Sequence, residues 1–213
     1  LGLIYAAQKK FEKAVKYYEK GIKIDPKFAM IYSNLGLIYF SKKSSANISK
    51  AENLYKKSIH LDGNNAEPHN NLGTLYNSIS KYKSAEVCFN KAISINSNFL
   101  FAYYNLGTLL ITMGNFSEAE KNLKKSISLN SNFVTAHRAL SRIIKYSVND
   151  EHLLQLENLY KSSNIQKMED KVDLYFSLGK AYEDTKNYSD SFYFYEKANS
   201  IYRKYVKYSE TQE

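Results

Sequence analysis

Apolar residues recur along the chain at the three- and four-residue spacing of amphipathic helices, with few interruptions. They are organised around a Leu-Gly pair followed by further apolar residues, as in Leu35-Gly36-Leu37-Ile38-Tyr39. The glycine of this unit stands at positions 2, 36, 73, 107 and 179, and Ser141 holds the equivalent place. The unit therefore recurs about every 34 residues, which predicts a stack of similar helix pairs instead of a single closed core.

Small and bulky residues alternate around each Leu-Gly pair in the same order. A small residue and a bulky one follow it four residues apart: Ala14 and Tyr18, Ala51 and Tyr55, Ala85 and Phe89, Ala119 and Leu123, Ser191 and Tyr195. A ring stands three residues before it: Tyr32, His69, Tyr103, His137 and Tyr175. Small residues let two helices approach closely, and bulky ones fill the space between successive pairs. The combination resembles the tetratricopeptide repeat, whose pattern is W-x2-L-G-x2-Y…A-x3-F…P.

The resemblance implies an all-α fold, a right-handed superhelical solenoid of about six antiparallel helix pairs, the fifth of them irregular. In each pair we call the first helix A and the second helix B. We expect an array over residues 1–145, and a second region over 146–213 that holds the end of the fifth repeat, the sixth repeat and a C-terminal helix. Three extra residues in the second repeat, around 43–47, are expected to enlarge its A–B turn. The fifth repeat should have its A helix over 134–145 and its B helix over 151–160.

A row of amides precedes the Leu-Gly pair in three consecutive repeats, at Asn34, Asn71 and Asn105. An amide donates and accepts hydrogen bonds at once, so such a row can bind the backbone of an extended peptide without reading its side chains. The row resembles the asparagine ladder in the repeats of O-GlcNAc transferase, which implies extended-peptide binding in a concave groove lined by A helices. The alternative is hydrogen bonding between neighbouring helices, or plain exposure to solvent. Ala139 and Ser177 interrupt the row in the later repeats.

Basic residues gather in the fifth repeat. Arg138, Arg142 and Lys145 have the i, i+4, i+7 spacing of one helix face, and Lys180 holds in the sixth repeat the place of Arg142. Guanidinium groups bind carboxylates and phosphates through two hydrogen bonds at once, so the four residues predict an anion-binding patch for an acidic peptide or a chain terminus. The alternative is local pairing with acids: Asp150, Glu151 or Glu183.

The net charge of +9 comes mostly from lysine, with arginine only at positions 138, 142 and 203. Lysines spread along helices are typical of a solvated surface, and the sequence shows no glycine-rich loop or aromatic platform for bases, so we expect no nucleic-acid partner. No apolar run reaches the length of a membrane span, so we expect no membrane partner. Cys88 is the single cysteine, which fits a reducing compartment, and we expect the cytoplasm. The chain begins at Leu1 without a methionine, and we expect it to be a segment of a longer protein.

Candidate chemistry is sparse. The four histidines have no metal-ligand spacing, and His69 and His137 hold places where rings pack. No phosphate-binding loop, nucleophile elbow or zinc motif occurs, and the acids of the helices have no arrangement for acid–base work. We therefore expect no metal, no cofactor and no catalytic residue in this segment. The leading hypothesis is a scaffold that binds a protein or peptide, with a purely structural spacer as a further alternative.

A closer resemblance covers residues 137–205. It is carried by residues 137–146, 150–153 and 174–184, together with Tyr188, Ser191, Phe192, Ala198, Asn199 and Arg203. These residues resemble the junction region of bacterial tetratricopeptide-repeat sulfotransferases, in which the repeats precede a sulfotransferase domain. In that family the domain binds the sulfate donor PAPS through a phosphate loop, and this sequence contains no such loop. The resemblance implies, as an alternative function, the N-terminal substrate-recognition region of a PAPS-dependent sulfotransferase whose catalytic domain is absent from this chain.

Overall fold

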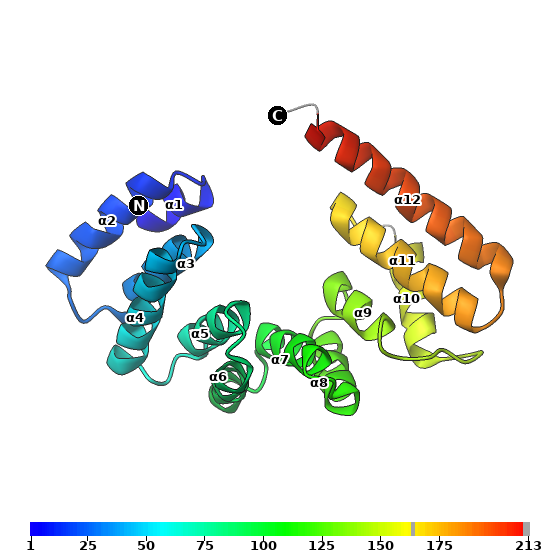
Figure 1. Cartoon of the computed structure of the whole chain (residues 1–213), viewed down its shortest axis with the longest axis horizontal. Helices are drawn as coiled ribbons and strands as arrows, with labels where there is room; N and C mark the ends of the chain where they lie inside the picture. Colours follow the sequence, from blue (N-terminus) through cyan, green and yellow to red (C-terminus); the bar gives the residue numbers. More distant parts are fainter. Residues whose placement is uncertain (163–164, 211–213) are drawn as a thin grey trace. The chain divides into compact units, whose positions relative to one another are not determined.

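The computed structural model describes residues 1–162 and 165–210, and for 205–210 it describes the backbone alone. These residues form α-helices and no strand (Figure 1), which confirms the all-α class. The helices are α1 (Gly2–Ala7), α2 (Phe11–Ile24), α3 (Ala29–Ser41), α4 (Ser45–Leu61), α5 (Ala66–Ser78), α6 (Tyr82–Ile95), α7 (Leu100–Thr112), α8 (Phe116–Leu129), α9 (Val134–Ser141), α10 (Glu151–Lys161), α11 (Met168–Asp184) and α12 (Tyr188–Glu210).

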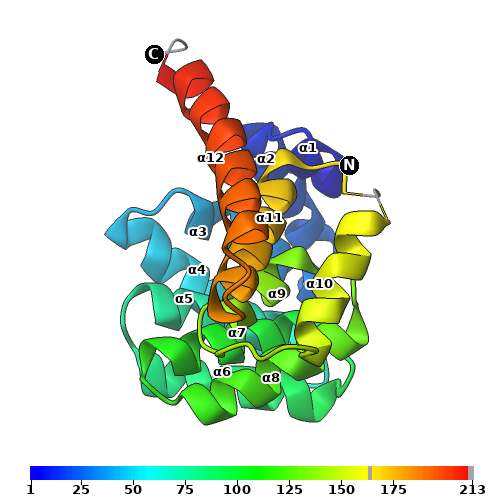
Figure 2. The same ribbon diagram turned by 90° about the vertical axis from the view of Figure 1, so that its right-hand side faces the viewer.

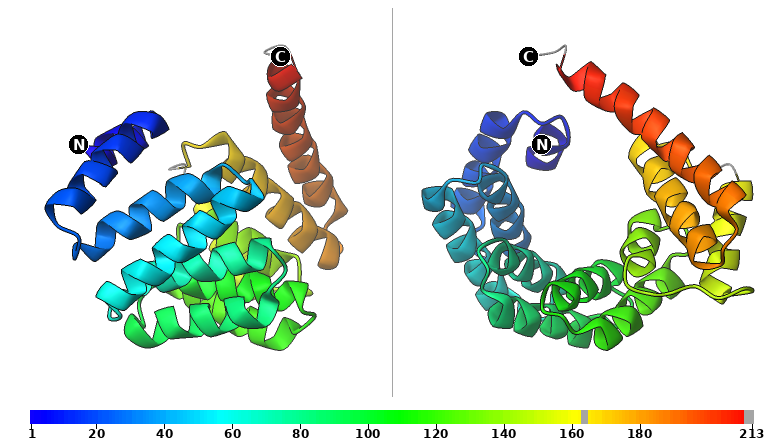
Figure 3. Two further views of the ribbon diagram at one scale, coloured as in Figure 1. Left: turned by 60° about the vertical axis from the view of Figure 1, so that its left-hand side comes forward. Right: turned by 45° about the vertical axis from the view of Figure 1, so that its right-hand side comes forward.

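The helices belong to two compact units, Leu1–Leu109 and Leu110–Glu213, and α7 contains the boundary between them. In the first unit α1 packs on α2, α3 on α4 and α5 on α6 (Figure 3). In the second unit α11 and α12 lie side by side (Figure 2), and α9 contacts both α8 and α11. Short turns join the two helices of these pairs, so the partners run antiparallel as the sequence predicts.

The turn from the A helix to the B helix keeps the same length in the first four repeats. Three residues separate α1 from α2, α3 from α4, α5 from α6 and α7 from α8. The prediction that the extra residues around 43–47 enlarge this turn is therefore wrong. They lengthen the helix instead, since α4 has 17 residues where α2, α6 and α8 have 14. Ser44 caps α4 early by accepting a hydrogen bond from the Asn47 backbone N–H at 3.3 Å.

In every repeat but the fifth, the A–B turn has a residue in the left-handed region seven residues after the glycine of the Leu-Gly pair; in the fifth the residue is Asn149, eight residues after Ser141. Only the fourth repeat uses a glycine there, Gly114, with φ of 78°. The other turns use Lys9, Lys43, Ser80 and Lys186, with φ between 53° and 62°. A side chain makes this conformation about 1 kcal/mol less favourable than it is for glycine, so these turns carry local strain.

Ser80→Gly is expected to stabilise the first unit by about 0.5–1 kcal/mol, because the strain of the left-handed turn is removed and the greater freedom of the unfolded chain offsets only part of the gain. Urea denaturation followed by circular dichroism measures the change. Gly114→Ala is the matched control at the same turn position. No atom lies within 4 Å of a Cβ added there, so it should destabilise through the backbone alone. A destabilising Ser80→Gly would contradict this account.

Within the pairs, the glycine of the A helix lies under a ring of the B helix. A Cβ added at Gly73 would stand 2.6 Å from Cε1 of Phe89, and one added at Gly36 would stand 2.6 Å from Cε1 of Tyr55. Gly179 and the Tyr195 ring repeat the arrangement in the second unit, at 2.8 Å. Phe89 and Tyr55 are almost fully buried. The Leu-Gly pair therefore exists because only a residue without a side chain lets the ring of the B helix close the pair.

The turn from one repeat to the next is closed by a side chain. Asp25, Asp62, Asn96 and Asn130 end α2, α4, α6 and α8, and each accepts a hydrogen bond at 3.0–3.1 Å from the backbone N–H two residues later. This local bond turns the chain away from the helix. The equivalent residue of the sixth repeat is Tyr202, which cannot make such a turn, and α12 runs through it to Glu210, with 23 residues in all.

The fifth repeat differs from the prediction in its first helix. The expected A helix over 134–145 ends at Ser141, because α11 holds the chain beyond it in a non-helical path. The Tyr146 backbone N–H donates to Asp184 Oδ2 at 3.0 Å, and Lys180 Nζ donates to the Ile144 carbonyl at 2.7 Å. The B helix agrees within one residue: α10 begins at Glu151, capped by Asp150, and ends at Lys161.

Candidate functional site

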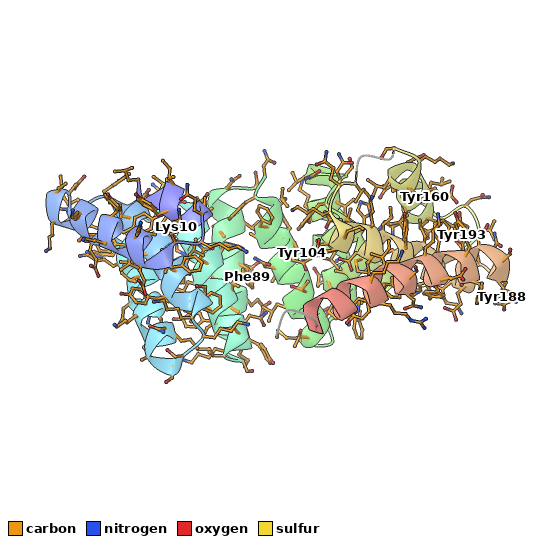
Figure 4. All side chains as sticks on the ribbon, turned by 90° about the horizontal axis from the view of Figure 1, so that it is seen from above. Lys10, Phe89, Tyr104, Tyr160, Tyr188 and Tyr193 are labelled. Carbon is orange, nitrogen blue, oxygen red and sulfur yellow. The ribbon has the colours of Figure 1, made fainter. Side chains whose placement is uncertain are left out.

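The predicted amide row lies in the first unit, on one stripe of residues from each of three A helices. The stripe follows i, i+4, i+7 spacing, so its members share a helix face. It consists of Met30, Asn34 and Leu37 on α3, of Glu67, Asn71 and Thr74 on α5, and of Phe101, Asn105 and Thr108 on α7. We call these nine residues the A face. Figure 4 labels Tyr104, which adjoins Asn105 on α7.

The asparagines of the A face are half-buried, and two of them connect successive A helices. Asn71 Nδ2 donates to Ser33 Oγ at 3.3 Å, and Asn105 Nδ2 donates to Asn70 Oδ1 at 2.9 Å. Both bonds run from the amide of one repeat to the residue just before the equivalent amide of the preceding repeat. Hydrogen bonding between helices, one of the alternatives in the sequence, is therefore present at two of the three amides. These bonds use N–H groups and fix the orientation of the amide.

The basic residues of the second unit are only partly arranged as predicted. Arg142 and Lys145 lie beyond the last residue of α9, so the argument that they share a helix face with Arg138 is wrong. Lys180 donates to the Ile144 carbonyl and to Asp184, and its Nζ lies 5.2 Å from the centre of the Tyr146 ring. Its charge therefore fastens the segment after α9 onto α11.

Arg138 also has partners within the protein. Its guanidinium lies 5.2 Å from the centre of the Phe176 ring, and its Nε lies 4.0 Å from Asp173 Oδ1. The acids that pair with the cluster are thus Asp173 and Asp184, and not those that the sequence suggested. Burial raises the pKa of Asp173, and Arg138 opposes part of that rise. Arg142 and Lys145 are exposed.

A buried chain of polar side chains links α9, α10 and the segment between them. His137 Nε2 lies 2.9 Å from the Ser131 carbonyl, and His137 Nδ1 lies 2.9 Å from His152 Nε2. His152 Nδ1 lies 2.7 Å from the Tyr146 hydroxyl, which lies 3.0 Å from Ser141 Oγ. The two imidazole rings are nearly parallel, at an angle of 7°, with centres 5.0 Å apart.

The hydrogen atoms of this chain have one consistent arrangement. The Ser131 carbonyl can only accept, so His137 carries its proton on Nε2 and accepts at Nδ1. His152 then donates from Nε2, and its Nδ1 is left to accept from the Tyr146 hydroxyl, which has one proton and shares it between His152 Nδ1 and Ser141 Oγ. Every ring nitrogen is used with both histidines neutral. Accordingly burial lowers the pKa of His152 to about 3, with help from His137, and burial also lowers the pKa of His137.

Sequence reasoning assigned His137 to packing and did not connect it with His152. Their separation of 15 residues matches no ligand or catalytic motif. The contact depends on the early end of α9, which brings Tyr146 and His152 under the helix. A signal was present nonetheless, since His137, Tyr146 and His152 are three ring residues that bear polar atoms in the one repeat whose pattern is irregular.

A second aromatic cluster of the second unit surrounds its own cation. Lys197 Nζ lies 4.4 Å from the centre of the Tyr193 ring, 5.6 Å from that of Tyr160 and 5.7 Å from that of Tyr175. It also donates to the Tyr160 hydroxyl at 3.3 Å. Figure 4 shows Tyr160 and Tyr193 near each other on α10 and α12. The cluster resembles an aromatic cage that is already filled by a residue of the same chain.

Other chemistry is limited in the part of the chain that the structure describes. There, no three histidine, cysteine or acidic residues are grouped so that they could hold a metal ion. Burial raises the pKa of the Cys88 thiol to about 11, which makes it a poor nucleophile. Within the same residues, no helix is both long enough and apolar enough to cross a membrane.

Comparison with protein families gives matches over most of the chain. Models of the tetratricopeptide repeat, one of them described as TPR repeat, match residues 2–43, 66–99, 101–133 and 172–205. The last match falls within the segment that resembles the sulfotransferase junction, and the family found there is the repeat itself. The comparison with curated proteins gives no match.

Several solved structures share the fold at low sequence identity. PilF of Pseudomonas aeruginosa is 20% identical, with a TM-score of 0.72 over 99% of this chain and 93% of that one. YrrB, described as a TPR protein with an unusual peptide-binding site, is 23% identical, with a TM-score of 0.62 over 86% and 91%. The first TPR of Spaghetti bound to the HSP90 peptide SRMEEVD is 24% identical, with a TM-score of 0.51 over 54% and 89%.

Proposed function

Because the chain belongs to the tetratricopeptide-repeat family, we propose that it is a non-catalytic scaffold that binds a protein or an extended peptide on the A face of its first unit. The observation that carries the proposal is the amide row. Asn34, Asn71 and Asn105 hold the same register on α3, α5 and α7, and two of them are oriented by bonds between helices. Amides held in place bind with less loss of conformational entropy than mobile ones. The peptide-binding site in the description of YrrB and the HSP90 peptide bound to Spaghetti support this use of the fold.

The geometry of an extended peptide fits the row. Neighbouring packed helices lie about 8–10 Å apart, and an extended chain advances about 3.3 Å per residue, so each A helix would meet about every third residue of the ligand. The Oδ1 atoms of Asn71 and Asn105 accept no hydrogen bond from the described residues. They are placed to accept from the backbone N–H groups of a ligand. A helical ligand would offer few such groups, since its backbone is bonded internally.

The double variant Asn34→Ala with Asn71→Ala is expected to weaken peptide binding by about tenfold, since each lost hydrogen bond to the ligand contributes about 0.5–1.5 kcal/mol. The probe is an array of capped peptides of about twelve residues and varied composition, followed by fluorescence anisotropy with the peptides that it retains. Ser33→Ala tests the orientation of Asn71, because it breaks the Asn71 bond within the protein and keeps both amides. Asn90→Ala, at an exposed position of α6 outside the A face, is the matched control. Equal binding by the wild type and the double variant would refute the role of the row.

The basic cluster supports a separate proposal in the second unit, an anion-binding patch. Lys180 contributes little to it because its charge is used by Asp184 and the Ile144 carbonyl. Arg142 and Lys145 carry it, as exposed cations in the segment that follows the half-buried Arg138 along the chain. Acidic peptides are the ligands that such residues would bind.

A further inference from the structure

The A helices of the first unit are almost without charge, in a protein whose net charge is +9. Neither α3 nor α7 contains a single lysine, arginine, aspartate or glutamate. In α5 the one charged residue is Glu67, in the first turn. The B helices differ sharply: α2 alone carries Glu12, Lys13, Lys16, Glu19, Lys20 and Lys23. The lysines that make the chain basic are thus absent from the A face.

Apolar side chains stand on this uncharged surface without being buried. Met30 is 40% exposed, Leu37 is 44% exposed and Phe101 is 49% exposed. They flank the amide row, since Met30 and Phe101 precede Asn34 and Asn105 by one helical turn and Leu37 follows Asn34 by one turn. The face therefore alternates apolar contacts with hydrogen-bonding groups across α3 and α7.

From this arrangement we infer that the ligand of the A face is an extended segment without charged side chains, whose apolar side chains pack on Met30, Leu37 and Phe101. The inference rests on the proposed function, because it takes the amide row to bind the backbone of the ligand. An acidic segment would lose the hydration of its carboxylates and meet no cation on the face, only Glu67. A basic segment would also lose hydration, and Glu67 is the one carboxylate of the face with which it could pair.

The affinity should therefore depend little on salt. Ion pairs between exposed charges are screened at high ionic strength, whereas burial of apolar surface is not weakened by it. We expect the dissociation constant of a retained uncharged peptide to change less than about twofold between about 0.05 and 0.5 M NaCl. Binding to the basic cluster of the second unit would weaken strongly over the same range.

The test uses the full chain and the peptide array described above, sorted by the charge of the retained peptides. Leu37→Glu is expected to weaken the uncharged peptides by about tenfold, because one partly exposed apolar contact becomes a carboxylate that binding must desolvate. Val87→Glu is the matched control: Val87 is 69% exposed on α6, outside the A face. Both positions are exposed enough for the protein to fold. Arg142→Glu is included because it should abolish the binding of acidic peptides to the basic cluster of the second unit, which identifies the peptides retained there.

Three outcomes are distinguishable. Retention of uncharged apolar peptides that are lost in Leu37→Glu and kept in Val87→Glu supports the inference. Retention of acidic or basic peptides alone, or equal binding of uncharged ones by Leu37→Glu and the wild type, overturns it and leaves the proposed scaffold function standing. If no peptide of any charge is retained, the proposed function itself fails.

Discussion

Acidification from pH 6.5 to pH 4.5 is expected to lower the free energy of unfolding of the second unit by about 2 kcal/mol through His152 alone. The pKa of His152 in the folded protein is about 3, against about 6.5 when unfolded. As the pH falls below 6.5, the unfolded chain binds a proton that the folded chain cannot accept. Stability is therefore complete above pH 6.5 and is lost progressively toward pH 3. His137 adds to the loss, because its pKa is also lowered.

Urea denaturation at the two pH values, followed by circular dichroism, measures this loss. The double variant His137→Asn with His152→Asn is the control. The change in its free energy of unfolding between the two pH values comes from the other titratable groups. Asp173 acts in the opposite direction, since its raised pKa lets the folded protein bind a proton first. An NMR titration of labelled histidines tests the same claim if the double variant is too unstable. A wild type that loses no more stability than the double variant would show that the histidine chain is not the cause.

Gly73→Val is expected to destabilise the first unit by about 3 kcal/mol, because the new side chain would overlap the Phe89 ring. The Cβ alone would stand 2.6 Å from Phe89 Cε1, and the ring is 1% exposed, so it has no space into which it can move. Urea denaturation of the variant measures the effect. Gly63→Val is the matched control, since its Cβ would meet only the Ile59 carbonyl oxygen, at an ordinary 3.5 Å.

The double variant Gly73→Val with Phe89→Leu shows whether the clash is the cause. The fourth repeat has Leu123 where the third has Phe89, and Leu123 is fully buried, so the fold accepts the smaller residue at this place. We expect the double variant to be more stable than Gly73→Val alone, with a favourable interaction of about 1 kcal/mol or more. Additive effects would mean that the glycine is required for another reason.

The sequence predicts the repeats because their signals are local and recur. Leu-Gly pairs, small residues and rings mark where helices touch, and the structure places helices α1–α8 accordingly. The errors arise where one local signal competes with another or with a distant contact. At Ser44 the capping hydroxyl moves the start of α4, and this keeps the A–B turn at three residues. The chain leaves the helix after Ser141 because the Tyr146 backbone N–H bonds to Asp184, 38 residues later, and no periodicity reveals that contact.

In the candidate sites too, the features that repeat along the sequence could be predicted, and those that depend on distant contacts could not. The register of Asn34, Asn71 and Asn105 is visible in the sequence because it repeats. Ser33 and Asn70 accept the hydrogen bonds from Asn71 and Asn105. The sequence does not reveal these bonds, because they depend on how one repeat packs on the next. The basic patch depended on extending α9 by four residues, and it changed when Lys180 proved to hold the Ile144 carbonyl.

The side chains that close the turns between repeats, at Asp25, Asp62, Asn96 and Asn130, give the chain natural points of recombination. Each turn is completed within three residues by its own carboxylate or amide. A junction formed at such a turn therefore does not depend on residues elsewhere in the sequence. A duplication or deletion that runs from one such turn to the next would add or remove a whole helix pair and leave both junctions intact. This gives an evolutionary route by which an array can change length in steps. The segment that contains Tyr202 has no carboxylate or amide at this position to close a turn, so it could not be exchanged as a helix pair in the same way.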